Sequence, residues 1–270
     1  MPKKGNKKKG KSAAKAGSGN GGGVVAARES DQGKVGAGSK WVKGGKGSRP
    51  AFDPFDTLAQ AIEVRNSAED SPCRAGALTK CALYRDAIFS VANVMLPEEC
   101  AAAVAAAERT GFEAAVQAAT RTHAYRDNDR LLVQQPRLAA ALWARVQMFV
   151  PGEIDGRRPI GLNKAVRIYR YGPGQRFGQH IDGSVQCPET GAWSEYTVLV
   201  YLNGGGDDEL RGGETTFWKG TGKKQTVALS FPPARGACLL HGHGHRCLLH
   251  AGEEVQRGVK YLLRSDVMYG

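Results

Sequence analysis

The spacing of hydrophobic positions changes near residue 163, and this change divides the chain into a helical part and a strand-rich part. Upstream, apolar residues recur at helical spacing over residues 53–65 and 136–150. A third helix is predicted in an alanine-rich segment that opens with Pro97 and two glutamates and ends at Gly111. The stripe of the 136–150 helix consists of Leu138, Leu142, Val146 and Phe149.

Short strands are predicted where apolar and β-branched runs alternate with glycine- or proline-rich turns. Residues 84–96 form one such run. Residues 121–130 are polar, and we expect them to be irregular. Eight further strands are expected at residues 164–171, 179–182, 196–203, 214–218, 226–231, 237–241, 246–250 and 259–269. Their near-regular spacing favours a mainly β fold with a double-stranded β-helix (jelly-roll) core, flanked by helices.

The first 50 residues differ in composition from the rest. They contain 13 of the 38 basic residues and only Glu29 and Asp31 as acids, whereas the remaining 220 residues carry 25 basic and 24 acidic groups. Few apolar residues are available to offset the entropy of ordering, so we expect a disordered basic tail over residues 1–50. A nuclear address, an RNA-contacting arm and a plain solubilising tail all fit this composition.

Cysteine usage and the distribution of apolar residues indicate the compartment. The six cysteines show no close pairing, and the N-terminus has no apolar stretch typical of a secretory signal. Free thiols and a cytoplasmic or nuclear location are therefore expected. No run approaches the roughly 20 apolar residues needed to span a membrane, so no membrane association is predicted.

The strongest candidate chemistry is the pair His180 and Asp182. Both lie on a predicted strand, where residues two apart project to the same face, so an imidazole and a carboxylate can bind one metal ion together. Two histidines and one carboxylate on one face of an octahedron are the ligands of iron(II) that activates oxygen. The pair therefore needs one further histidine.

Candidates for that histidine lie in a segment with four histidines in ten residues, from His241 to His250. An independent zinc site is disfavoured, because paired close spacings that include cysteine are absent. His250 is the best third ligand, since it follows an apolar run suited to a buried strand. His123, alone in a polar segment, fits a solvated side chain better than a ligand.

The last predicted strand places two cations on one face. Lys260, Leu262 and Arg264 alternate with Tyr261 and Leu263. A cation on an inward face needs an anion, which the distal carboxylate of a dicarboxylate could supply, whereas an edge strand would leave both cations exposed.

Four motifs in order resemble the prolyl 4-hydroxylase-type 2-oxoglutarate and Fe(II)-dependent dioxygenases. They are Tyr171-x-x-Gly-Gln-x-Phe-x-x-His180-x-Asp182, the run Thr197-Val-Leu-Val-Tyr201-Leu-Asn, the run Gly212-Gly-Glu-Thr-Thr-Phe217, and His250-Ala-Gly-x-x-Val-x-x-Gly-x-Lys260. The resemblance covers roughly residues 85–270, which we take as the dioxygenase domain, with residues 51–84 as a helical and loop lead-in.

The resemblance implies a catalytic metal site and a cosubstrate site. It implies Fe(II) bound by His180, Asp182 and His250, with 2-oxoglutarate, O2 and the accessory reductant ascorbate as partners in the reaction. Lys260 would bind the C5 carboxylate of 2-oxoglutarate, and Tyr171 and Tyr201 would line its pocket. Arg264 is a rival cation on the same strand face, and His241 stands where the pattern predicts an apolar residue.

Hydroxylation of a C–H bond in a protein or peptide, with conversion of 2-oxoglutarate to succinate, is the function that this resemblance implies. A nucleic-acid demethylase is a second reading, but the near-neutral domain leaves nucleic-acid contact to the basic tail. A jelly roll that only binds a partner is a third. The substrate is expected to bind at residues 121–130, His243, His245 and residues 183–195. Trp193 and Tyr196 either cover the entrance of the active site or pack as ordinary aromatic residues. The oligomeric state is left open.

Overall fold

The computed structural model describes residues 28–29, 53–68, 71, 78–206 and 209–270. The predicted disordered tail therefore lies almost wholly outside the described residues. Of the tail, the structure describes only β1 (Arg28–Glu29), which pairs in parallel with Ile181–Asp182. The domain boundaries thus stay predictions.

Three helices form at the predicted places. They are α1 (Pro54–Ser67), α2 (Pro97–Thr110) and α3 (Pro136–Val146), the last extended by a 3-10 turn, Gln147–Phe149. Each has a proline in its first turn, where the missing N–H needs no partner. The Asp53 side chain caps α1, and Gly111 ends α2 at a positive φ of 93°.

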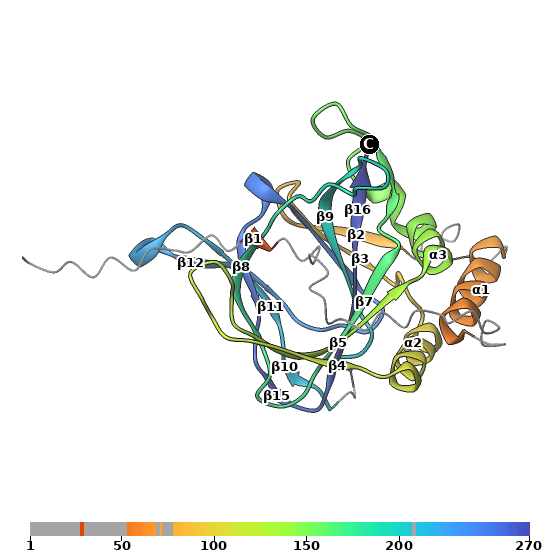
Figure 1. The fold of residues 1–270 in the computed structure, drawn as a ribbon, viewed down its shortest axis with the longest axis horizontal. Coiled ribbons are helices and arrows are strands. Elements are labelled where there is room, and N and C mark those ends of the chain that lie inside the picture. Colours follow the sequence, from red (N-terminus) through yellow and green to blue (C-terminus); the bar gives the residue numbers. More distant parts are fainter. Residues whose placement is uncertain (1–27, 30–52, 69–70, 72–77, 207–208) are drawn as a thin grey trace, which may run out of the picture.

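The strands form one large sheet that nearly closes on itself (Figure 1), which confirms the predicted jelly roll. Its main path runs in the order β12-β11-β14-β8-β5-β7-β16-β9-β13-β3-β2, with β1, β4 and β6 paired beside it. The end strands β12 and β2 approach each other, and β10 and β15 form a separate two-stranded sheet.

The strand bounds follow the predicted segments closely in the C-terminal part. They are β2 (Thr79–Tyr84), β3 (Ile88–Ala92), β4 (Glu113–Gln117), β5 (Arg126–Gln134), β6 (Pro159–Leu162), β7 (Ala165–Tyr171), β8 (Phe177–Asp182), β9 (Trp193–Tyr201), β10 (Arg211–Gly212), β11 (Thr215–Lys219), β12 (Thr226–Phe231), β13 (Cys238–Gly242), β14 (Leu249–Gly252), β15 (Val255–Arg257) and β16 (Lys260–Tyr269). The run predicted at 84–96 contributes only β3, and the run at 246–250 begins with a 3-10 turn, Gly244–Arg246.

The expectation of an irregular segment at residues 121–130 is wrong for its second half. Strand β5 begins at Arg126 and continues to Gln134. Its inward positions are polar, since Arg126 and Asn128 are buried, and this disguises the alternation that identifies a strand. The pattern also does not predict β2, β4 or β6.

Two apolar clusters lie on opposite faces of the sheet. The larger one joins the three helices to one face and includes Val200, Leu240 and Leu263. The smaller one lies inside the roll and includes Tyr201, Leu239 and Leu262, the sequence neighbours of those residues. This alternation leaves the inner face of β8, β9, β13, β14 and β16 free for polar side chains.

Two smaller expectations are also tested. The five cysteines that the structure describes are free thiols. No helix among the described residues has the length and apolar character needed to cross a membrane.

Candidate metal and cosubstrate site

The sheet brings His250 directly opposite His180. Strands β8 and β14 are antiparallel neighbours, and these two histidines are register partners. Asp182 follows His180 by two residues and therefore projects to the same face. One nitrogen or oxygen atom from each of the three side chains lies within 4.8 Å of those of the other two. All three residues are at least 96% buried. The predicted trio is thus assembled.

Backbone carbonyls orient both imidazoles. Nδ1 of His180 lies 2.9 Å from the carbonyl oxygen of Gly178, and Nδ1 of His250 lies 3.0 Å from that of Leu248. Each Nδ1 therefore carries the proton and donates it, which leaves the Nε2 lone pair for a metal ion. These Nε2 atoms lie 3.5 Å and 3.9 Å from the Asp182 carboxylate.

Only one oxygen of Asp182 has hydrogen-bond partners. Oδ2 accepts from the Thr197 hydroxyl at 2.5 Å and from Arg264 at 3.3 Å. Oδ1 is buried and has no hydrogen-bond partner in the structure. A buried carboxylate oxygen without a partner is costly, and a bound cation would satisfy it. The donor set fits a divalent metal on this observation.

Protonation states also favour a metal. Burial lowers the pKa of His180 well below its ordinary value, and burial likewise lowers that of His250, so both are neutral at pH 7. Burial alone would raise the pKa of Asp182, but Arg264 and the nearby histidines outweigh it and hold the pKa well below its usual range. Neutral imidazoles and an ionised carboxylate are the forms that bind metal ions.

Lys260 lies inside the roll, at the start of β16. Its residue is 3% exposed, and its Nζ donates to the carbonyl oxygen of Gly213 at 2.6 Å. No carboxylate of the described residues lies within 4.0 Å of Nζ to form an ion pair. Burial lowers the lysine pKa to about 8, against the opposing influence of Glu214 and Glu253. The edge-strand alternative is therefore wrong for Lys260.

Two tyrosines flank this ammonium group. Nζ of Lys260 lies 5.5 Å from the ring centroid of Tyr171 and 5.6 Å from that of Tyr201. The hydroxyl of Tyr201 shares a 2.7 Å hydrogen bond with Thr215. Burial raises the pKa of both tyrosines, so they remain neutral hydroxyls. The structure therefore brings both tyrosines of the motif beside the lysine.

Arg264 has a different environment from Lys260, although both lie on the same strand face. Its guanidinium contacts Asp182 at 3.3 Å, Thr197 at 3.4 Å and Asp266 at 3.7 Å. This arginine is thus engaged with the carboxylate of the trio. The two cations that the sequence could not distinguish are distinguished by their partners.

Arg126 is a third buried cation in this region that sequence reasoning did not single out. It lies on β5, is 6% exposed, and stacks 4.1 Å above the ring of Phe177. Burial lowers its pKa, while the nearby Tyr169 and Tyr171 oppose that shift. The signal that could have found it is the alternation Arg126-x-Asn128, once β5 is recognised as a strand.

His241 lies within the same cluster. It is 1% exposed on β13, and its Nε2 is 3.7 Å from Asp182 Oδ2. With Cys247 and His250 it forms a second group of possible metal ligands. His123, by contrast, is exposed and contacts Thr120 and Thr122, so the solvated interpretation is confirmed.

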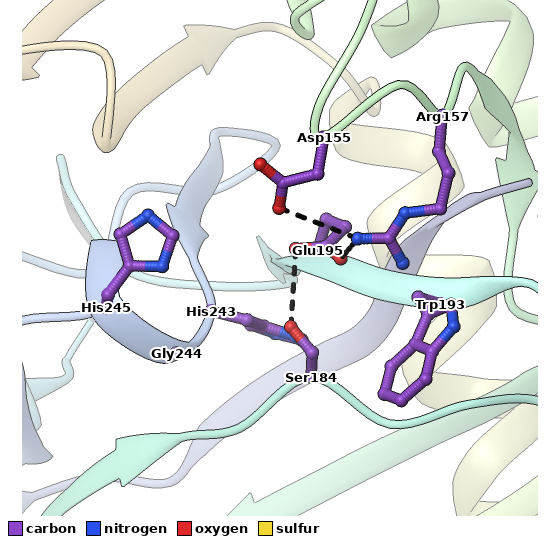
Figure 2. A pocket seen from close by; sticks show the side chains of 8 residues that line it. All are labelled: Asp155, Arg157, Ser184, Trp193, Glu195, His243, Gly244 and His245. Atoms are coloured by element: carbon purple, nitrogen blue, oxygen red, sulfur yellow. Dashed lines mark hydrogen bonds and ion pairs between the residues drawn. The ribbon is translucent and has the colours of Figure 1, made fainter.

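A cavity of about 340 Å³ is lined by residues that include Ser184, two residues after Asp182 (Figure 2). It brings together residues expected on the substrate side, namely Ser184, Trp193, Glu195, His243 and His245, with Asp155, Arg157 and Gly244. Figure 2 shows Glu195 at its centre, contacted by Arg157 at 2.8 Å and by Ser184 at 3.3 Å. Nε2 of His243 lies 2.8 Å from the Thr197 hydroxyl, which in turn donates to Asp182.

The remaining substrate-side candidate, Tyr196, does not line this cavity. Its residue is 1% exposed, its hydroxyl donates to the backbone of Asp86, and its ring packs at 5.9 Å from Phe89. It is an ordinary packed aromatic residue.

Comparison with known proteins now gives the class. Residues 166–265, which include the whole trio and both candidate anchors, match the family model of the 2OG-Fe(II) oxygenase superfamily. This segment, which carries the trio, is thus similar to the 2OG-Fe(II) oxygenase superfamily. Iron and 2-oxoglutarate are the cofactor and cosubstrate that this family implies, and the donor set described above fits the metal. No curated protein matches the chain.

Several solved structures are similar to this chain at low sequence identity. The viral collagen prolyl hydroxylase of Paramecium Bursaria Chlorella virus-1 is 19% identical, with a TM-score of 0.48, over 67% of this chain and 95% of its own. A prolyl-4-hydroxylase of Pseudomonas putida is 13% identical, with a TM-score of 0.45, over 78% and 97%. A Trichoplax adhaerens prolyl hydroxylase, solved with a hypoxia inducible factor peptide, is 15% identical, with a TM-score of 0.49, over 79% and 91%.

Proposed function

We propose that the protein is a hydroxylase of protein substrates, and that His180, Asp182 and His250 hold its Fe(II). The observation that carries the metal assignment is the pairing of His250 with His180 beside a buried Asp182 oxygen that has no hydrogen-bond partner. Two imidazoles and one carboxylate are the ligand set of oxygen-activating iron(II), and three coordination positions stay open.

Lys260 is the proposed anchor for the C5 carboxylate of 2-oxoglutarate. Its ammonium group is buried, has no ion-pair partner among the described carboxylates, and lies between Tyr171 and Tyr201. A carboxylate at Nζ would supply the missing anion, with the neutral hydroxyls as further partners. Arg264 instead holds Asp182 in place, and Arg126 adds positive charge to a site for a dianion.

The chemistry divides between the bound groups and the protein. Bound Fe(II), together with 2-oxoglutarate and O2, supplies the oxidation of a C–H bond, with succinate and carbon dioxide as products. The protein's residues orient the ligands through Gly178 and Leu248, keep Asp182 ionised through Arg264, and exclude water by burial. Ascorbate is proposed as an accessory reductant.

A protein substrate is favoured by charge and by the cavity. Residues 51–270 have a net charge of only +1, which suits a peptide better than a polyanion. The cavity in Figure 2 contains Trp193 and the hydrogen-bonding side chains of Ser184 and His245, which can bind a peptide side chain. The prolyl 4-hydroxylase-type motifs make proline the first residue to test.

Succinate formation tests the metal and cosubstrate part. Full-length protein with Fe(II), ascorbate and 2-oxoglutarate is expected to produce succinate, and His180→Ala is expected to abolish both Fe(II) binding and turnover. His123→Ala is the matched control, since that histidine is exposed and its hydrogen bond to Thr122 does not involve the trio. A protein that binds neither Fe(II) nor 2-oxoglutarate would refute the proposal.

Comparing hydroxylated residues in proteomes with and without the enzyme tests the substrate part. New hydroxyl groups on proteins, lost with His180→Ala, are expected. Trp193→Ala should raise the KM for the peptide found in this way and leave uncoupled succinate formation unchanged. Oxidised nucleic-acid bases without any protein product would contradict the substrate assignment.

A further inference from the structure

We propose that His241 is a fourth metal-contact residue, so that the resting site binds its metal through three imidazoles and one carboxylate. This inference rests on the metal site of the proposed function and adds a residue that the two-histidine pattern does not contain. His241 lies on β13, two strands away from β16 in the sheet order and on the opposite side of the roll from β8.

The distance to Asp182 does not separate His241 from the two predicted histidine ligands, although His241 is not part of the group in which the ligand atoms of His180, Asp182 and His250 all lie within 4.8 Å of one another. Its Nε2 lies 3.7 Å from the Asp182 carboxylate, between the 3.5 Å of His180 and the 3.9 Å of His250. The rings of His241 and His250 are 4.4 Å apart at their centroids, about as close as the 4.2 Å between His180 and His250. Three imidazoles thus surround one carboxylate at similar range.

The Nε2 atom of His241 lacks any other role. It is buried and has no hydrogen-bond partner in the structure. A buried polar group left without a partner costs about 1–3 kcal/mol, and the neighbouring positions of β13, Leu239 and Leu240, are apolar. An aliphatic side chain would avoid that cost, so the imidazole needs a partner that the protein does not provide. A metal ion bound to Asp182 would provide it.

The ring of His241 is held less firmly than those of the other two histidines. His180 and His250 donate Nδ1–H to backbone carbonyls at 2.9 Å and 3.0 Å. Nδ1 of His241 has only the Cys247 sulfur at 4.0 Å, which is a weak partner. His241 is therefore the ligand that can leave.

Such a ligand has a consequence for the order of binding. Four protein donors would leave two of six coordination positions. A bidentate 2-oxoglutarate and the oxidant together would need three positions. Since 2-oxoglutarate alone would fill those two positions, His241 would have to leave before the oxidant could bind. His241 would strengthen metal retention in the resting protein.

In a competing arrangement, a metal would bind at the Nδ1 side of the His241 and His250 rings, next to Cys247. Cys247 Sγ lies 3.6 Å from Nδ1 of His250 and 4.0 Å from Nδ1 of His241, and these three residues also form a possible ligand group. Binding there would require His250 to give up its bond to Leu248 and Cys247 to lose a proton. Burial raises the pKa of that thiol, which opposes its ionisation. The geometry favours the edge that faces Asp182.

The test counts imidazoles on a bound metal in the full-length protein. With Cu(II) as the probe, pulsed electron paramagnetic resonance should detect three imidazoles in the wild type and two in His241→Leu. The wild-type measurement needs no variant to fold, and His241→Asn provides a second replacement.

Co(II) affinity gives an independent readout. Without 2-oxoglutarate, His241→Leu should weaken Co(II) binding by about 10- to 100-fold, the usual range for groups that support a metal site. His123→Leu is the control and should bind as the wild type does.

Three outcomes would overturn the inference. Two imidazoles in the wild type, with unchanged Co(II) affinity in His241→Leu, would refute it and leave the proposed function intact. A thiolate-to-Co(II) absorption band that disappears in Cys247→Ser would refute it by placing the metal on the other edge of the rings. Absence of metal binding in the wild type would overturn this inference and the proposed function together.

Discussion

Replacing Lys260 by methionine should weaken 2-oxoglutarate binding strongly and leave metal binding nearly unchanged. Methionine keeps the length of the apolar stem that passes Tyr171 and Tyr201 and removes only the charge. Since Lys260 contacts the Gly213 carbonyl rather than a member of the trio, the metal ligands should stay in place.

The magnitude follows from the buried charge. The pKa of Lys260 falls from 10.5 to about 8, a differential interaction of about 3 kcal/mol at 1.36 kcal/mol per unit. A ligand carboxylate that restores the ordinary value regains that free energy, which corresponds to about 300-fold in affinity. This agrees with the ~3–5 kcal/mol expected for removing one partner of a buried ion pair.

Isothermal titration of the Co(II)-loaded protein with 2-oxoglutarate under air measures this directly. The Kd should rise by about 300-fold in Lys260→Met, with the Co(II) Kd itself within about threefold of the wild type. Arg264→Met is the contrasting variant, since it should weaken Co(II) binding through loss of its contact with Asp182. Unchanged 2-oxoglutarate affinity in Lys260→Met, with loss of it in Arg264→Met alone, would reverse the assignment.

The pH dependence of the same titration has a definite sign. Binding requires protonated Lys260, whose population falls as pH rises through about 8, so affinity should fall about tenfold between pH 7 and pH 9. The facing groups are Tyr171 and Tyr201, whose pKa values are raised out of this range, and Glu214 and Glu253, which oppose the lowering of the lysine pKa. Lys260→Arg should retain binding and remove the pH dependence.

Three further predictions concern positioning and stability. Thr197→Val removes the 2.5 Å hydrogen bond to Asp182 and should weaken Co(II) binding about 10- to 100-fold by titration, whereas Thr197→Ser should not; equal affinities would contradict this role. Gly213→Ala forces a Cβ to 3.0 Å from the lysine stem at a φ of +75°, so the KM for 2-oxoglutarate should rise, and an unchanged KM would refute the close packing. Arg145→Ala breaks a buried ion pair and should lower the free energy of unfolding by about 3–5 kcal/mol in denaturant titrations. Arg137→Ala removes one partner of an exposed pair and should change the free energy of unfolding little.

Most of the fold could be predicted from local patterns. The helices α1, α2 and α3 follow from apolar stripes, prolines in the first turn and a terminal glycine, all of which act over a few residues. The C-terminal strands follow from two-residue alternation. Strand β5 was missed because Arg126 and Asn128 place polar groups on its inward face, where only the packed roll can bury them.

The candidate site was predictable to the extent that it depends on spacing. His180 and Asp182 share a face because they are two residues apart, and the motif around His250 and Lys260 resembles that of a known family. The distinction between Lys260 and Arg264 was not predictable, since both have the same strand phase. It depends on which cation reaches Asp182 and which one lies between the two tyrosines.

The sequence by itself determined the helices, most strands, and the three side chains expected to bind metal, because periodicity and motif spacing are properties of the chain. Only the tertiary structure decided that His250 pairs across the sheet with His180 and that His241 reaches the same carboxylate. Strand register and the curvature of the roll bring these side chains together. Both arise from contacts between segments that are distant along the chain.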